Sequence, residues 1–304
     1  MITKISDWIK SFGQSKNTGT IYEQIVGIQI LIASGLDKRE NIPEEYNSEF
    51  LTIKEYENVE GIINTSLDDN IGGTSDIGIL KNGNWEYCSI KKMKSNHLST
   101  CIHNPTSKGD YGINKDDYNI NETISLAQAW YIDNNKGENP NPSWKRPGGN
   151  YFDEVSGPFL SNIANDASKN WNQSPQPQNI EKLRKYIDID EKGNTITESI
   201  IFADKEGIQK IYKWGKMKIN IEEYLYVKSD SSYLYHCSDI NNHENTWILK
   251  TQVKFNNGLI ELPSRKASVN EWDKPIESLK IGNPFTSWNV TANLSKIFEM
   301  IEVY

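Results

Sequence analysis

The spacing of hydrophobic residues changes along the chain and predicts helices, strands and the breaks between them. Apolar residues recur at helical spacing over residues 20–36, where Gly35 suits the end of a helix. Residues 122–133 and 153–171 also have a helical pattern, whereas residues 59–65 are typical of a strand. The first half of the chain is therefore expected to combine helices with strands.

Proline interrupts this pattern in the segment NQSPQPQ, residues 172–178. This segment is the best candidate for the boundary between two parts of the chain. Beyond it, the segments EYLYVKS, SYLYHCS and WILKTQVKF alternate apolar and polar residues, and Asn257-Gly258 predicts a hairpin turn. We expect an α/β fold in the mixed α+β sense, with a central mixed β-sheet flanked by helices. Residues 1–171 would form the core, and residues 179–304 a β-rich C-terminal part packed on it.

The most informative pattern lies in residues 71–94, IGGTSDIGILKNGNWEYCSIKKMK, where two apolar runs flank Asn82-Gly83. Asn-Gly is the preferred sequence of a two-residue type I′ turn. With that turn, the numbers of opposed residues sum to 165, so Asp76 faces Ser89. Strand alternation places Lys91 on the same face.

The opposite face of this hairpin would then carry Ile77, Ile79, Cys88 and Ile90, which suit a buried core. Lys92 also falls on that opposite face. Two plainer interpretations stay open. Asp76 is also a common residue type in turns, and the lysines at the end of the hairpin are also typical of a charged strand edge.

Charge and cysteine content narrow the classes of protein. The 304 residues carry a net charge of −8, which argues mildly against a nucleic-acid partner. Residues 81–108, however, contain five lysines and one glutamate, a net charge of +4. Three cysteines make no disulfide framework, and neither a signal-peptide core nor an apolar stretch long enough to span a membrane is present. A cytoplasmic location is expected.

The hairpin resembles the active-site region of the PD-(D/E)XK nuclease superfamily, in which an Asp starts one strand and an acid-x-Lys triplet follows on the next. The corresponding segments are Ser75-Asp76 and Ser89-Ile90-Lys91. The acid of the triplet is replaced by Ser89, as in the MspI-like branch of type II restriction endonucleases, which carries a neutral residue there. The resemblance covers about residues 20–100 and implies a restriction-endonuclease-like fold.

The resemblance also implies roles for these residues. Asp76 would bind Mg²⁺, assisted by the backbone carbonyl of Cys88 or Ile90, because Mg²⁺ prefers oxygen ligands. Ser89 would orient a metal-bound water, and Lys91 would stabilise the phosphate. Glu23 would be a further catalytic and metal-site residue, contributed by the first helix. Alternatively, Glu23 belongs to a capping box with Thr20 and only bonds the helix backbone.

Polar and basic residues elsewhere are predicted to contact DNA. They are Lys92, Lys94, Lys145, Arg146, Arg265, Lys266, Thr286, Ser287, Trp288 and Asn289. Lys92 and Lys94 also fit an ordinary charged strand edge, and the others fit an exposed loop, a polar turn or a solvated surface. A zinc site formed by Cys101, His103, His236 and Cys237 is disfavoured because the chain has no C-x-x-C pair, and core thiols and surface imidazoles are the expected alternative.

The predicted function is that of a Mg²⁺-dependent type II restriction endonuclease that cuts double-stranded DNA at a short specific sequence. Residues 1–171 would be its catalytic core, and residues 179–304 would grip the DNA. A homodimer is possible, and a cognate DNA methyltransferase would be its genetic partner. The alternatives are a structure-selective or repair nuclease of the same fold and a non-catalytic module that binds carbohydrate or protein.

Overall fold

The computed structural model divides the chain into two compact units, each formed from separate stretches of sequence. It describes residues 1–13, 18–46, 49–50, 53–65, 75–93, 99–100, 105–134, 152–190, 192, 195, 197–255, 283–285 and 288–304. Unit 1 comprises Met1–His103, Ile187–Ile219 and Asn293–Tyr304. Unit 2 comprises Asn104–Tyr186 and Asn220–Ala292.

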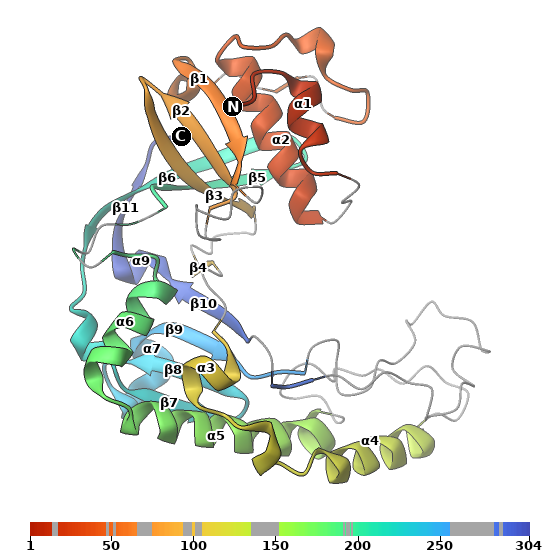
Figure 1. Ribbon diagram of the computed structural model, residues 1–304, viewed down its shortest axis with the longest axis vertical. Coiled ribbons are helices and arrows are strands. Elements are labelled where there is room, and N and C mark those ends of the chain that lie inside the picture. Colours follow the sequence, from red (N-terminus) through yellow and green to blue (C-terminus); the bar gives the residue numbers. More distant parts are fainter. Residues whose placement is uncertain are drawn as a thin grey trace. The chain divides into compact units, whose positions relative to one another are not determined.

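Unit 1 is a mixed sheet with the helices α1 (Ile5–Lys10) and α2 (Thr18–Ala33) against one face (Figure 1). Its helices are α1 (Ile5–Lys10), α2 (Thr18–Ala33), α9 (Leu294–Ile297) and the short 3-10 helices η1 (Arg39–Asn41) and η2 (Lys54–Tyr56). Its strands are β1 (Val59–Asn64), β2 (Ile77–Lys81), β3 (Asn84–Lys92), the two-residue β4 (Ser99–Thr100), β5 (Ser199–Asp204), β6 (Gly207–Met217) and β11 (Phe298–Glu302).

Six of these strands form the central sheet, in the order β1-β2-β3-β5-β6-β11. The pair β3–β5 is parallel, whereas the other pairs are antiparallel. A parallel pair needs a long crossover connection, and here the connection from β3 to β5 contains the first stretch of unit 2. The expected mixed α+β class with a mixed central sheet is confirmed.

The hairpin β2–β3 has the predicted register. Ile77 pairs with Cys88 and Leu80 with Trp85, so opposed residue numbers sum to 165. Asn82 and Gly83 have φ angles of 51° and 76°, as a type I′ turn requires. The face that carries Ile77, Ile79, Cys88 and Ile90 is buried with α1 and α2 in one core.

The helix α2 lies close to α1 because Gly27 has no side chain at their contact. A Cβ atom built on Gly27 would lie 2.1 Å from the indole ring of Trp8. The Trp8 indole N–H also donates to the backbone carbonyl of Gln24, at 3.1 Å. Trp8 is fully buried, so this contact fixes α2 against the rest of the unit.

Unit 2 combines a second sheet with the longer helices of the C-terminal two thirds of the chain (Figure 1). Its helices are α3 (Ser107–Tyr111), η4 (Lys115–Asp117), α4 (Ile120–Asn134), the π-helical turn η5 (Phe152–Ser156), α5 (Gly157–Gln173), α6 (Gln176–Tyr186), η6 (Ile221–Tyr224), η7 (Ile240–Asn242) and α7 (His243–Thr246). Its strands, in sheet order, are β10 (Asn289–Asn293), β9 (Trp247–Gln252), β8 (Tyr233–Cys237) and β7 (Val227–Asp230).

The core of unit 2 is aromatic. Tyr111 packs between Trp171 and Trp288, with ring centroids 5.3 Å apart in both pairs. The Tyr111 hydroxyl lies 3.2 Å from Nε2 of the fully buried His236. Burial lowers the pKa of His236 to about 3, so this imidazole is neutral. The expectation of surface imidazoles is therefore wrong for His236.

The boundary expected at residues 172–178 differs from the one observed. Residues 104–186 belong to unit 2, whereas residues 187–219 and 293–304 return to unit 1 and supply β5, β6 and β11. The proline-containing segment spans the end of α5, the short link at Ser174 and Pro175, and the start of α6. Local breaker residues mark a turn, but they do not show which sheet the later strands join.

Candidate active site

Asp76 is the centre of the candidate site, immediately before β2. Its Oδ2 atom accepts a hydrogen bond from the Ser89 hydroxyl at 3.0 Å and one from the Ile90 backbone N–H at 2.6 Å. The Lys91 ammonium lies 3.5 Å from the same oxygen. Three consecutive residues of β3 therefore fix one carboxylate, as the predicted register requires.

The second oxygen of this carboxylate is available to a ligand. Within the described part of the chain, no hydrogen bond to Oδ1 of Asp76 is present, and about a quarter of the side chain is exposed (27%). Lys91 is exposed to a similar extent (28%). A group that approaches from solvent can thus contact both side chains.

The backbone of β3 favours one of the two carbonyls, those of Cys88 and Ile90, that were predicted as candidate metal ligands. The Cys88 carbonyl accepts the Asp76 backbone N–H at 2.9 Å, so it is already engaged in the strand ladder. The Ile90 N–H points at the Asp76 side chain. In extended backbone, the carbonyl of a residue points to the same side as its N–H, so the Ile90 carbonyl also points toward Asp76.

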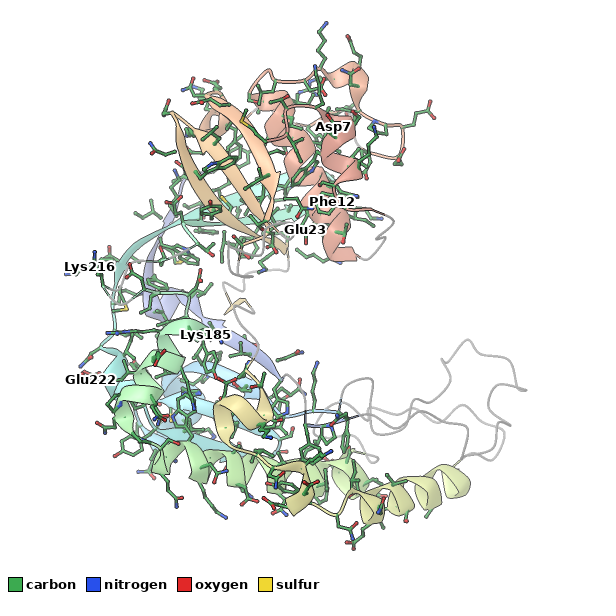
Figure 2. The ribbon with its side chains drawn as sticks, viewed as in Figure 1. Asp7, Phe12, Glu23, Lys185, Lys216 and Glu222 are labelled. Atoms are coloured by element: carbon green, nitrogen blue, oxygen red, sulfur yellow. The ribbon has the colours of Figure 1, made fainter. Side chains whose placement is uncertain are left out.

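Glu23 joins the site from α2. Burial raises its pKa from 4.5 to about 7, the negative charge of Asp76 adds to the rise, and Lys91 opposes it. Figure 2 shows Glu23 at the end of α2 that lies beside the end of β3. Two acids and one ammonium group from three segments of the chain therefore interact electrostatically.

The alternative role of Glu23 in a capping box does not fit the observed helix. α2 begins at Thr18, so Thr20 lies within its first turn rather than at the capping position. A capping box requires the threonine to precede the helix. The structure thus leaves Glu23 near the helix end that faces Asp76 and places Thr20 at a helical position instead of the capping position.

The residues of the site, Glu23, Asp76, Ser89, Ile90 and Lys91, suit hard-cation and phosphate chemistry. The two carboxylates and the Ile90 carbonyl provide the oxygen ligands that Mg²⁺ prefers. Lys91 adds a cation that can contact a phosphate oxygen, and Ser89 holds Asp76 in place. Bound Mg²⁺ would supply charge neutralisation and a more acidic water.

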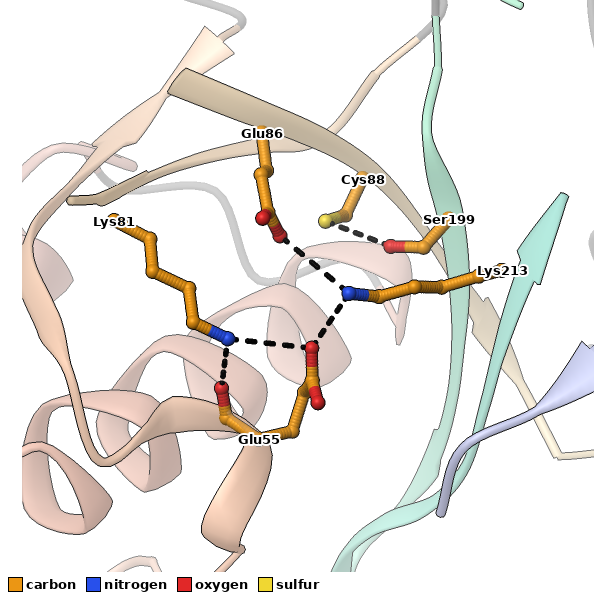
Figure 3. Close-up of polar contacts among 6 residues, drawn as sticks. All are labelled: Glu55, Lys81, Glu86, Cys88, Ser199 and Lys213. Carbon is orange, nitrogen blue, oxygen red and sulfur yellow. Dashed lines mark hydrogen bonds and ion pairs between the residues drawn. The ribbon is translucent and has the colours of Figure 1, made fainter. Parts of the chain in front are cut away.

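The opposite face of the same strands has an ion network instead of a site (Figure 3). Lys213 Nζ lies 2.6 Å from Glu55 and 4.0 Å from Glu86, and Lys81 lies 3.3 Å from Glu55. Burial alone would raise the pKa of Glu55, but its bonds to Lys213 and Lys81 lower it below 4.5. Every charge here has a partner, so this network is structural.

Two of the predicted DNA contacts with described side chains lie at the surface, and one does not. Lys92 is exposed, with its ammonium 5.7 Å from the centre of the Tyr22 ring, and Asn289 is exposed on β10. Trp288 is completely buried, and its indole N–H donates to the Pro284 carbonyl at 2.8 Å. A role of Trp288 in contacting DNA is therefore wrong, because a core side chain cannot reach a nucleic acid. Predictions for Lys94, Lys145, Arg146, Arg265, Lys266, Thr286 and Ser287, and for the Asn257-Gly258 hairpin, lie outside the described residues.

Unit 2 contains one other group with metal-ligating atoms. Among the described residues, Asp230, His243 and Glu244 bring such atoms within 4.8 Å of one another. Asp230 and Glu244 are exposed, and His243 Nε2 lies 3.4 Å from Asp230. The zinc alternative is not supported by Cys237 and His236, which are buried in the core, and Cys101 and His103 lie outside the described residues.

Comparison with known proteins adds no relative: no protein-family model, curated protein or solved structure matches this chain. Among the described residues, no helix is both long enough and apolar enough to cross a lipid bilayer.

One group of residues on the same sheet face was missed by sequence reasoning. In the segment KIYKWGK, residues 210–216 of β6, every second residue from Lys210 onward is a lysine or an aromatic residue. The alternation itself was visible as a strand signal. Its relation to Asp76 was not, because β6 is more than a hundred residues away in sequence and joins the sheet through β5.

Proposed function

We propose that unit 1 is a Mg²⁺-dependent nuclease that hydrolyses phosphodiester bonds of double-stranded DNA at a short specific sequence, as type II restriction endonucleases do. The observation that carries this proposal is the convergence of Glu23, Asp76 and Lys91, which come from α2, the start of β2 and the end of β3. The restriction-endonuclease-like character of the sheet is part of the same proposal.

Each side chain has a distinct task in this proposal. Asp76 and Glu23 bind the cation, and the Ser89 and Ile90 donors keep Asp76 oriented. Lys91 interacts with the scissile phosphate, where negative charge grows during attack by water. The replacement of an acid by Ser89 leaves Glu23 as the second carboxylate of the site, which explains why a neutral residue suffices in the triplet.

The direct test is incubation of plasmid and phage DNA with the purified protein in Mg²⁺ or in EDTA. For a sequence-specific nuclease, discrete DNA bands are expected with Mg²⁺ and not with EDTA. Asp76→Asn is expected to abolish cutting, because the amide is a neutral and weaker metal ligand. Asp7→Asn is the matched control, because Asp7 is exposed on α1 and belongs to no part of the site.

The other outcomes decide between the alternatives. A ladder of products without fixed ends would favour a structure-selective or repair nuclease of the same fold. DNA that stays intact with several substrates and cations, or cutting that survives Asp76→Asn, would contradict the proposal. Salt-insensitive binding of a carbohydrate or protein ligand would favour a non-catalytic module.

A further inference from the structure

The strand β6 carries a strip of alternating basic and aromatic residues, Lys210, Tyr212, Trp214 and Lys216. Residues two apart in a strand point to the same face of the sheet. Contacts support this arrangement, because Lys210 Nζ lies 3.4 Å from the Tyr212 hydroxyl and Phe202 makes an edge contact with the Tyr212 ring at 5.9 Å. We call these four residues the β6 strip.

The register of the sheet puts the β6 strip on the same face as the candidate active site. Lys91 pairs with Phe202 of β5, and Phe202 pairs with Lys210 of β6. Neighbouring strands lie about 4.8 Å apart, so Lys91 and Lys210 are separated by roughly 10 Å across the sheet. Lys213, one residue out of phase, points to the opposite face and joins the ion network there.

A cavity of about 550 Å³ lies at the far end of the strip. Trp214 and Phe298 contribute aromatic walls, with ring centroids 5.3 Å apart. Lys192 and Lys216 also line it, together with Thr195, Glu198, Gly215 and Met217. The volume lies within the usual range of small-ligand sites, about 300–1,000 Å³, so one nucleobase with its sugar fits.

The charges on this face are mixed. The positive charges come from Lys192, Lys210 and Lys216, and the negative charges from Glu198 and Glu302. Glu302 accepts a hydrogen bond from the Tyr212 hydroxyl at 2.6 Å. Lys216 is exposed at the end of β6 (Figure 2). A surface with lysines beside partly exposed aromatic rings suits a strand with phosphates and planar bases better than it suits a purely anionic ligand.

We propose that the β6 strip and its cavity bind one strand of the DNA substrate where that strand has separated from its partner, with phosphates on Lys210 and Lys216 and the unpaired base against Trp214. This inference rests on the proposed nuclease function of unit 1. From Lys91 to Trp214 the path is roughly 16 Å, two strand spacings across and four residues along. A stacked strand advances about 3.4 Å per nucleotide, so about five nucleotides separate the bound base from the cut.

The test measures binding apart from cleavage. A fluorescein-labelled single-stranded oligonucleotide of mixed sequence is titrated with the full chain in EDTA and followed by fluorescence anisotropy. Binding that weakens with added salt is expected, because phosphate contacts release counterions. Trp214→Leu is expected to weaken binding about 10-fold, because the variant loses the stacking of one base on an aromatic ring. Trp214→Tyr is expected to retain most of the affinity, because tyrosine also stacks.

Matched variants separate this role from a structural one. Lys216→Gln is expected to weaken binding about 3-fold, with a shallower salt dependence. Lys38→Gln is the control, because Lys38 is an exposed lysine of unit 1 outside the sheet. Thermal unfolding of every variant shows whether the fold is kept.

Three results would overturn the inference. They are failure of the wild-type chain to bind the oligonucleotide, equal affinity of Trp214→Leu and Lys38→Gln, and equal loss with leucine and tyrosine at position 214. If the protein cuts DNA in Mg²⁺ but these variants bind the oligonucleotide normally, the nuclease proposal stands and the binding role of the β6 strip is contradicted. If the variants lose binding but no condition gives cutting, the nuclease proposal fails and the strip remains a binding surface.

Discussion

At the scale of single residues, Asp76 is held by donors from consecutive positions of one strand. The Ser89 hydroxyl and the Ile90 N–H both donate to its Oδ2, and Lys91 lies beside the same atom. A carboxylate held in this way needs little reorganisation when a cation arrives. Ser89 therefore has a physical role at this position, because its hydroxyl orients the Asp76 carboxylate.

Lys91→Ala is expected to slow DNA cutting at saturating DNA by about 100-fold or more, because loss of one donor to the developing charge has effects of that size. Binding in EDTA should change little. Lys38→Ala is the matched control, since Lys38 is an exposed lysine of unit 1 outside the sheet. Equal cutting rates of the two variants would exclude a catalytic role for Lys91.

Glu23 gives a prediction for stability against pH. Burial raises its pKa to about 7, against 4.5 in the unfolded chain. Between these two values the unfolded state releases a proton that the folded state keeps, so a rise in pH through this window lowers the free energy of unfolding. Glu23→Gln is therefore expected to be more stable than the wild type at pH 8 and similar to it near pH 4.

Urea unfolding in EDTA at several pH values measures this difference. The EDTA matters because a bound cation would stabilise the ionised carboxylate and reverse the trend. A variant whose stability tracks the wild type at every pH would mean that Glu23 is not buried beside Asp76.

At the scale of elements, the site depends on how α2 is seated. Gly27 allows Trp8 of α1 to lie directly on the α2 backbone, and a methyl group there would overlap the indole ring. In an exposed helix, Gly to Ala stabilises by up to about 1 kcal/mol. At Gly27 the same change should instead destabilise the protein, because the α2 backbone and the Trp8 indole are both fixed in the core.

Gly27→Ala is expected to lower the free energy of unfolding by about 1–3 kcal/mol, the usual cost of overpacking a core. It should also slow cutting, because a displaced α2 moves Glu23 away from Asp76. Urea unfolding and cutting assays check both effects. A variant that is more stable than the wild type would show that α1 and α2 do not make this contact.

At the scale of the whole molecule, the sheet of unit 1 is completed by chain that follows the first stretch of unit 2. β5 and β6 follow residue 187, and β11 lies near the C-terminus. In a fragment of residues 1–171, the inner strand β3 would become an edge, and the core beneath it would lose Ile201, Ala203, Ile208 and Ile211. An exposed hydrophobic edge strand promotes aggregation.

The fragment 1–171 is therefore expected not to fold cooperatively, whereas the full chain should. Far-ultraviolet circular dichroism during thermal and urea unfolding distinguishes them, with sedimentation to detect aggregates. A cooperative transition in the fragment would restore the boundary that the proline-containing segment suggested.

The sequence determined those features that depend on neighbouring residues. The Asn82-Gly83 turn fixed the hairpin register, and the period of two then put Asp76, Ser89 and Lys91 on one face. The spacing of isoleucines gave α2, although its start at Thr18 instead of Thr20 decided against the capping box. These results follow because turn geometry and side-chain period are local properties of the backbone.

Only the tertiary structure decided which distant segments meet. It brought Glu23 to Asp76, buried Trp288 and His236, and placed β6 two strands from Lys91. It also divided the chain after His103, Tyr186, Ile219 and Ala292, and not within residues 172–178. Strand pairing and burial depend on contacts between residues far apart in sequence, and a strand pattern alone does not specify its neighbour in the sheet.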